Sequence, residues 1–525
     1  MRKFFLALLC ITASYAPNAY AAEPTIDDAG AARLQKSFTE ILDYVKTVYG
    51  PDIFGTQTPP LIFEGDLKVE KQSTFYSITW PHMYYQEPAG TKIDLGVMAF
   101  NAVPGDKDGD WKMTMALPAS YAMTDPDGKV IKINIGAQNT VALFNESLGY
   151  FTKYDANFEN ITLSGAEEAL KVFKIEKVHL LSNLSEESDK TLSGPFDLSF
   201  NDISIEAADN TDAVKVHIGR IGLDGKIDKF TPVSLKEYKE KLSKYAETLK
   251  SLHPTDAGAP QANIDPKAMI DMFSDLYSFN MNGAEAKYSL QDLTITSNDE
   301  NLKNLNIKSA YFMAGTNGLL SDKGSMDLGL GYSNLKIDPL KPGYEGSIPE
   351  NVNISLRAQK IPVQILTTLG KNSLAAIGSN PDMAAMAGMG FVMKLPAILS
   401  QAGTEVIVKD TFIKGGLYNA AIDGKLVADL NAVASATGSF NGVFEGLDDL
   451  YALAEKNAAN PDFPDASTFA SVLQPLGMLK AFGKPGSGPS GKPAYLYDLK
   501  LTPEGKFLIN GQDLSPPQGQ QGQLP

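Results

Sequence analysis

Much of the chain alternates apolar and polar residues with a period of two, the pattern of a β-strand with one buried and one solvated face. A short form of this pattern recurs, in which Asn or Asp precedes an apolar, a polar and an apolar residue. Its copies begin at Asp66, Asn160, Asp202, Asp292, Asn304, Asn334, Asn353 and Asp498. Because Asn and Asp favour turns, the pattern predicts that these residues mark the edges and entries of antiparallel strands. The copies have no constant spacing, which argues against a regular solenoid.

A second repeated pattern predicts the turns between these strands. An acidic residue followed by Gly, Lys and an apolar residue begins at Asp127, Asp224, Asp423 and Glu504. An acid before Gly is a hairpin signal, because Gly adopts positive φ without a Cβ clash. In two copies, Pro126 or Pro503 stands two residues before the Gly and supplies the φ that a β-turn needs.

Helical spacing replaces the alternation in several segments. Near the start, Leu34, Phe38, Ile41, Leu42, Val45 and Val48 predict an amphipathic helix that begins near Asp27 and stops at Gly50-Pro51. We expect it to dock on a sheet; an apolar flap or plug is the alternative. Residues 234–280 show two more helical patterns around a stretch rich in Pro, Gly and Ala, and form a candidate boundary between two β-rich halves.

These patterns predict a mainly β (α+β) fold, with an extended or curved antiparallel sheet and flanking amphipathic helices. We predict that the chain consists of a signal peptide (1–21), an N-terminal helix plus β-rich region (22–233), a helical connector (234–280), a second β-rich region (281–483), a linker (484–494), a C-terminal hairpin (495–512) and a disordered tail (513–525). The second β-rich region includes an apolar Met-rich helical segment at 360–402 and helices at 447–482.

The first residues indicate export. Arg2 and Lys3 precede an apolar run, and Ala19-Tyr20-Ala21 is a small-x-small cleavage site. We therefore predict cleavage after residue 21, a periplasmic or secreted location, and no transmembrane span afterwards, because no later segment is long and apolar enough. Cys10, the single cysteine, lies in the removed segment, so the mature chain has no disulfide.

The charge balance argues against nucleic acid as a partner. Without Arg2 and Lys3, the 46 basic residues become 44 and face 62 acidic ones, a net charge of -18. Such a surface repels phosphate backbones and anionic membranes.

The most apolar part of the mature chain contains a methionine stripe. Met383, Met386, Met389 and Met393 recur at helical spacing between Pro381 and Pro396. Such a stripe is most often part of a core. Its other use is a deformable apolar surface for partners or acyl chains, because thioether side chains adapt their shape. These four methionines are the candidate hydrophobic-ligand residues.

The sequence contains no recognisable set of catalytic, cofactor-binding or metal-binding residues. No pair among His82, His179, His217 and His253 has the spacing of a helical metal motif. Asp106, Asp108 and Asp110 suggest calcium, but Trp111 and Leu117 occupy the positions where an EF-hand loop needs Gly and Glu, so a solvated turn is expected. We therefore predict a protein that is not an enzyme.

The C-terminal 125 residues or so carry a family resemblance. An Ala-Gly-Thr strand at 402–404 is followed by an Asp-Gly-Lys-Leu hairpin and by an Ala-Thr-Gly-Ser strand that leads into 446–450; the closing strand at 501–505 runs to Asn510-Gly511. This order resembles YdgA-type and similar secreted Gram-negative proteins of unknown function. The resemblance implies a β-rich envelope protein and supplies no catalytic residues.

Two functional hypotheses follow. In the first, a non-enzymatic periplasmic envelope protein binds lipid or another hydrophobic ligand on its β-sheet scaffold. In the second, an envelope structural or interaction protein holds no small ligand and pairs its strand edges with protein partners.

Overall fold

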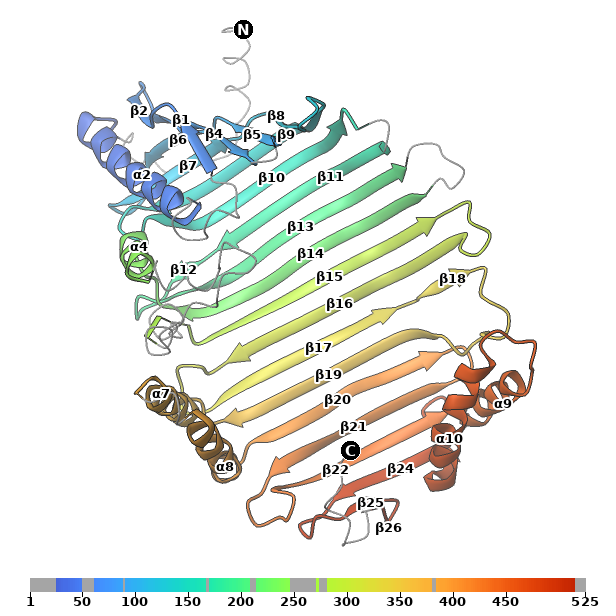
Figure 1. Cartoon of the computed structure of the whole chain (residues 1–525). Coiled ribbons are helices and arrows are strands. Elements are labelled where there is room, and N and C mark those ends of the chain that lie inside the picture. The colour runs from blue at the N-terminus through green and yellow to red at the C-terminus, as the bar shows by residue number, and fades with distance from the viewer. Residues whose placement is uncertain are drawn as a thin grey trace.

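One antiparallel sheet runs the length of the molecule (Figure 1). The computed structural model describes residues 25–49, 61–87, 90–166, 170–207, 214–245, 271–272, 281–379 and 384–514. The fold is mainly β with an extended antiparallel sheet, as predicted. The expected signal peptide (1–21), Met383 and the tail from residue 515 lie outside the described residues, as does most of the second helix expected in 234–280.

The N-terminal part combines one helix with short strands. These elements are α2 (Asp28–Tyr49), β1 (Leu61–Glu64), β2 (Lys68–Lys71), β3 (Tyr76–Thr79), β4 (His82–Gln86), β5 (Lys92–Gly96), β6 (Ala99–Pro104), β7 (Asp110–Ala116) and β8 (Ser120–Thr124). Helix α2 docks on this part of the sheet, as expected: Leu34 and Phe38 are buried against Ile78, Trp80 and Phe144. The phenol of Tyr76 accepts a hydrogen bond from the Asp27 amide at 2.8 Å and ties the start of α2 to β3.

The middle of the sheet consists mostly of long strands. They are β9 (Val130–Asn145), β10 (Tyr150–Ser164), β11 (Leu170–Asn183), β12 (Ser185–Glu186), β13 (Leu192–Ala207), β14 (Lys215–Phe230), β15 (Gly283–Thr296), β16 (Asn304–Asn317), β17 (Gly324–Ser333), β18 (Lys336–Asp338) and β19 (Pro349–Ile361). Helix α4 (Leu235–Lys244) follows β14. Strands β14 and β15 pair directly along almost their whole length. The sheet is therefore continuous from β14 to β15, and the boundary expected at 234–280 does not divide it.

The C-terminal part carries two helical pairs. Helices α7 (Val363–Ser379) and α8 (Ala384–Ala402) precede β20 (Glu405–Gly415), β21 (Asn419–Ala428) and β22 (Ala436–Glu445), and helices α9 (Leu447–Ala458) and α10 (Ala466–Phe482) precede β23 (Lys484–Ser487), β24 (Pro493–Leu501), β25 (Phe507–Ile509) and β26 (Gln512–Asp513). The helices predicted at 360–402 and 447–482 and the hairpin at 495–512 are therefore present. The linker predicted at 484–494 is wrong, because β23 pairs with β24.

The recurring Asn and Asp residues lie mostly inside strands, not at their entries. Asn160, Asp202 and Asp292 have φ of 54°, 53° and 52° within β10, β13 and β15. Asn and Asp adopt this left-handed conformation more readily than most residues, because their short polar side chains bond locally. The predicted role as strand entries is wrong for these three residues, whereas Asn304 does begin β16.

The left-handed residues shift the phase of the alternation. Apolar residues recur every second position on either side, but three positions separate Phe158 from Ile161 and Phe200 from Ile203. The described pairing skips the intervening residue in β10 and β13. Phe158 and Ile161 nevertheless contribute to one apolar cluster. The shift therefore keeps apolar residues on one side of a long strand.

Only two of the four acid-Gly-Lys patterns are turns. Gly128 and Gly505 have positive φ between strands, and they are the two copies with a preceding proline. Gly225 and Gly424 instead lie inside β14 and β21, opposite Phe196 and Phe440. A Cβ at either glycine would approach the facing ring to 2.3 or 2.4 Å. The turn prediction is wrong at these two sites, where Gly leaves room for a cross-strand aromatic ring.

Candidate functional site

The strand register aligns apolar side chains in rows that cross the sheet. One row contains Phe158, Val178, Phe200, Ile221, Leu290, Ala310, Tyr332, Val352, Ile413, Ala420, Phe444 and Tyr495, from β10 to β24. The next row contains Ala156, Leu180, Leu198, Leu223, Tyr288, Phe312, Leu330 and Ile354. Beyond the left-handed residues lie Ile135, Ile161, Ile175, Ile203, Ile218, Leu293 and Ile307. We call the side that carries these rows the apolar face.

The centre of the apolar face is open to solvent. Tyr288 is 55% exposed, Phe312 43% and Leu330 40%. We define the bare part of the face by its exposed apolar residues in β14–β20: Ile221, Tyr288, Phe312, Met326, Leu328, Leu330, Val406 and Ile413. An exposed apolar area of this kind marks a ligand site, a partner site or a membrane contact.

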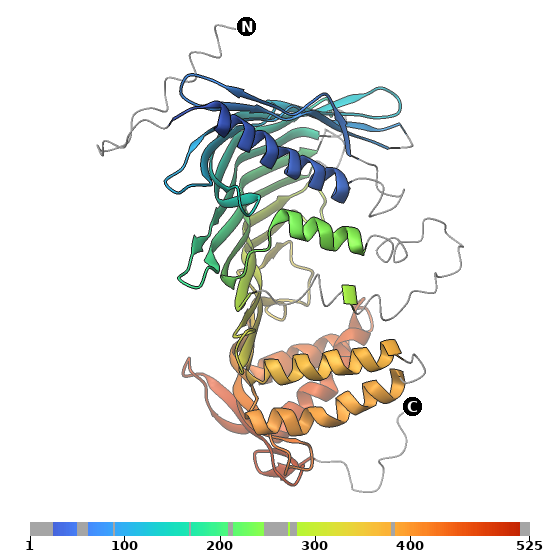
Figure 2. The same cartoon turned by 90° about the vertical axis from the view of Figure 1, so that its left-hand side faces the viewer.

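Helices border the C-terminal part of the sheet on both sides. Figures 1 and 2 show α7 and α8 along one lateral edge of the sheet and α9 and α10 along the other, all projecting from the same side. Leu447 of α9 and Phe469 of α10 pack with Phe444 and Tyr495, which belong to the first apolar row. The helices therefore project from the apolar face, and the sheet forms the floor of a trough between them.

The predicted methionine stripe lies on one of these walls. Met386, Met389 and Met393 are exposed on α8, the last of them by 77%. Exposure excludes a core role for these three residues in the described structure. They form an apolar helical surface at the edge of the trough.

The opposite side of the sheet, which we call the polar face, carries a cluster of ionisable side chains that hydrogen-bond to one another. His179 lies between Asp155 and Asp197 at 3.1 and 3.0 Å. Arg220 donates to Asp197 at 2.7 Å and to Asp224 at 2.5 Å. The hydrogen bonds from Arg220 lower the pKa of Asp224. These ionisable groups are hydrogen-bond partners of one another, so they do not need a ligand as a partner.

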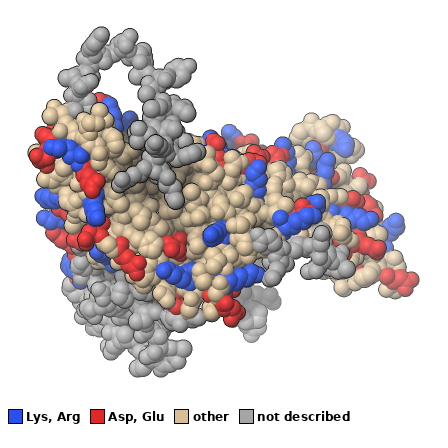
Figure 3. All heavy atoms as spheres, turned by 90° about the horizontal axis from the view of Figure 1, so that it is seen from above, with Lys and Arg blue, Asp and Glu red and all other residues tan. Residues whose placement is uncertain are grey.

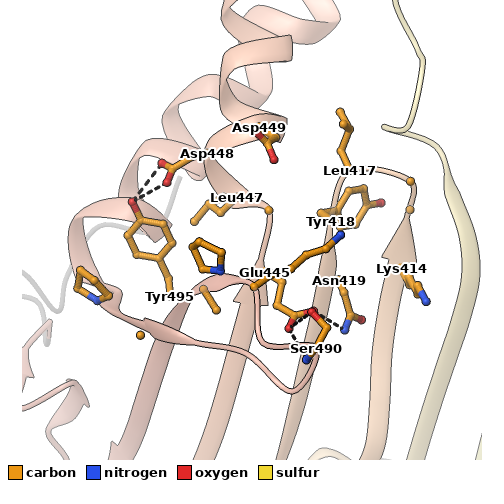
Figure 4. Close-up of a pocket in the computed structure, with 18 residues that line it drawn as sticks. Lys414, Leu417, Tyr418, Asn419, Glu445, Leu447, Asp448, Asp449, Ser490 and Tyr495 are labelled. Carbon is orange, nitrogen blue, oxygen red and sulfur yellow. Dashed lines mark hydrogen bonds between the residues drawn. The ribbon is translucent and has the colours of Figure 1, made fainter.

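A polar hollow at the C-terminal end, lined by Glu445, Ser490 and Asn419, has a structural explanation. Glu445 is buried, and its carboxylate accepts hydrogen bonds from the amide and hydroxyl of Ser490 and from Asn419 (Figure 4). Burial alone would raise the pKa of Glu445, but the bonds from Ser490 and Asn419 outweigh it and lower the pKa. Glu445 thereby holds the β23–β24 turn in place and is not free to act as a base or ligand.

The three aspartates considered for calcium are also engaged. Asp106 pairs with Lys112, Asp108 with Arg33, and Asp110 accepts from Asn145, in the turn between β6 and β7. Within the described ranges no group of three or more His, Cys, Asp or Glu residues could hold a metal ion. His82 lies beside Asp94 at 2.8 Å, and His253 falls outside those ranges.

The surface seen from above mixes both signs of charge. Lys and Arg alternate with Asp and Glu around its periphery, and uncharged residues occupy the middle (Figure 3). This view shows no extended basic area of the kind that binds a phosphate backbone. Among the described helices, none is both long and apolar enough to span a bilayer.

The chain matches no protein-family model, no curated protein and no solved structure. Fold and site alone therefore define its class: an open antiparallel sheet with a cluster of paired ionisable side chains on its polar face and an apolar face whose centre is bare.

Proposed function

We propose that this chain is a non-enzymatic envelope protein that holds lipid acyl chains on the bare part of its apolar face. The observation that carries the proposal is the alignment of exposed apolar residues from several strands into continuous rows. Each 100 Å² of apolar surface that a chain covers contributes about 2.5 kcal/mol. In the bare part, the phenol of Tyr288 is the polar group among the exposed side chains that define it; the others are hydrocarbon or thioether side chains.

The dimensions of the rows suit more than one chain. Neighbouring strands lie about 4.8 Å apart, so a row across the bare part, from β14 to β20, is roughly 24 Å long. The hydrocarbon core of a bilayer is about 30 Å thick, and one acyl chain spans about half of it. The apolar face therefore has room for several acyl chains, and the exposed methionines on α8 supply an adaptable border.

The proposed location is the periplasm of a Gram-negative cell. The basic start, apolar run and cleavage site in residues 1–21 support export. The resemblance to YdgA-type proteins supports the same compartment. Water there would make an open apolar surface costly unless a hydrophobic ligand covered it.

The sheet edges support the lipid proposal over strand pairing with a protein partner. Strand β2 at one end has four residues, three of them charged, and β26 at the other end has two. Strand β23 contains Pro485, which lacks an amide donor. Short, charged or proline-containing edges are devices that prevent strand addition.

Lipid extraction from the purified mature chain tests the proposal, with two variants of β15. Tyr288 lies on the bare part and Gln291 is exposed on the polar face, so Tyr288→Glu and Gln291→Glu add the same charge to opposite faces. We expect phospholipid or fatty acid with the wild type and Gln291→Glu, and at least about tenfold less with Tyr288→Glu. Lipid recovery no greater than from an unrelated acidic protein, or equal in both variants, would contradict the proposal.

A further inference from the structure

A cavity lies where the apolar face meets α10. We call it the α10 pocket; its volume is about 500 Å³, and it lies between α10 and the strands β21, β22 and β24. Its floor includes Ile422, Phe444 and Leu499, and Met478 and Leu479 of α10 line its other side. This volume lies in the range of small-molecule sites, which is about 300–1,000 Å³.

The lining leaves almost no polar partner for a ligand. The one phenol among the lining residues, that of Tyr497, donates to the Leu479 carbonyl at 2.9 Å. Burial raises the pKa of Tyr497 to about 12, so the phenol stays neutral at physiological pH. A carboxylate or phosphate placed against this lining would find no hydrogen-bond donor to replace the water that it displaces. The pocket therefore accepts hydrocarbon and rejects a head group.

The pocket continues the apolar face. Phe444 and Ala420 belong to the first apolar row, which reaches the bare part at Ile413. Small side chains make the space beside them: Gly442 is paired with Tyr497 and Ile422, and a Cβ there would meet the Tyr497 side chain only at 3.4 Å. A chain lying on the bare part could thus extend into the pocket without crossing a polar surface.

We propose that the α10 pocket takes the methyl end of one acyl chain whose polar end remains outside, on the bare part. This inference rests on the proposed function and adds a fixed orientation for one of the bound chains. The pocket sets the depth to which the acyl chain enters, and the methyl end of that chain lies against α10.

Two photoreactive fatty acids test the orientation on the full mature chain. One carries a diazirine at the methyl end and the other carries it next to the carboxyl group. We expect the methyl-end probe to label α10 or β22, and the carboxyl-end probe to label β14–β20, with peptides mapped by mass spectrometry. Equal labelling of α10 by both probes would overturn the proposed orientation.

Adjacent substitutions in β22 supply the matched control. Gly442→Leu places a side chain in the pocket, whereas Asn441→Leu places the same side chain on the opposite face, where residue 441 is exposed. We expect Gly442→Leu to reduce methyl-end labelling of α10 at least fivefold and Asn441→Leu to leave it unchanged. Unchanged labelling in a folded Gly442→Leu variant would contradict the pocket assignment, and the wild-type comparison of the two probes decides it if that variant does not fold.

The outcomes separate this inference from the proposed function. Labelling of β14–β20 by both probes without labelling of α10 would overturn the pocket alone. Labelling of neither region would overturn both proposals.

Discussion

Two regions of the same apolar face have opposite environments. Under α2, Tyr76, Ile78 and Phe144 are completely buried, and Phe38 packs its ring against Trp80, Phe100 and Phe144. In the bare part, side chains of the same kinds stand in the same strand pattern but remain exposed. The strands alternate apolar and polar residues in the same way in both regions. The difference in burial therefore comes from the helix that covers one region, and not from the sequence of the strands.

This difference separates stability from function. A buried ring contributes to folding because water has already been excluded from it. An exposed ring is still in contact with water, so its burial can contribute to the binding of a ligand. The covered region is therefore expected to determine the free energy of unfolding, and the bare part to determine what the protein binds.

Truncation of one ring in each region should give the largest difference in the free energy of unfolding. Phe144→Ala removes a buried ring and should lower the free energy of unfolding by about 3–5 kcal/mol. Phe312→Ala in the bare part should change it by less than about 1 kcal/mol in lipid-free protein. Urea unfolding followed by circular dichroism measures both. Equal losses would mean that the bare part is covered in solution.

The free energy of unfolding should also fall when Arg220, which pairs with two carboxylates of the polar face, loses its charge. Arg220→Met keeps the side-chain bulk but removes the bonds to Asp197 and Asp224, and should cost about 1.5–3 kcal/mol without changing lipid recovery. Because the pKa of Asp224 is lowered in the folded state, its contribution is present above the unfolded value of about 3.9 and is lost as pH falls through the folded value. The difference between variant and wild type should therefore shrink below about pH 4. A difference that stayed constant to pH 2 would contradict this assignment.

The left-handed residue of β10 should show a smaller effect. Asn160→Val forces a β-branched residue to adopt φ near 54° and should cost about 1–2 kcal/mol. Asn160→Gly tolerates that conformation and serves as the control, with little expected change. If valine and glycine behaved alike in thermal unfolding, the conformation of residue 160 would not matter for the phase shift.

The methionines of α8 should have the smallest effect on stability. Replacing Met386, Met389 and Met393 together by Gln keeps helix propensity and changes exposed side chains only, so each should contribute less than about 0.5 kcal/mol. Lipid recovery should nevertheless fall relative to wild type. Lys394→Gln, at an exposed position of the same helix, is the control for the changed surface. Unaltered recovery in the triple variant would remove α8 from the site.

The sequence predicted the elements well and their relative placement poorly. Periodicity found α2, the Met-rich helices and the strands, because these depend on local spacing. It misplaced Asn160, Asp202 and Asp292, because a turn-forming residue and a left-handed residue inside a long strand look alike locally. The same ambiguity affected Gly225 and Gly424, whose role depends on Phe196 and Phe440 in neighbouring strands.

The site itself could be predicted only in part. The methionine stripe was visible, but neither its exposure nor the rows on the sheet follow from single strands, because rows depend on register between strands. One local signal was available: the three-residue step from Phe158 to Ile161 recurs from Phe200 to Ile203. That step shows apolar residues kept on one side, but not which helix covers them.

Crosslinking from two positions of β15 tests the central claim most directly. A photoreactive phenylalanine analogue replaces Tyr288 on the bare part or Gln291 on the polar face, in a Gram-negative host that exports the protein. After irradiation of intact cells, mass spectrometry of the purified chain identifies the adducts. We predict lipid adducts from position 288 and none from position 291. A protein adduct without lipid at position 288, or equal lipid at both positions, would contradict the account.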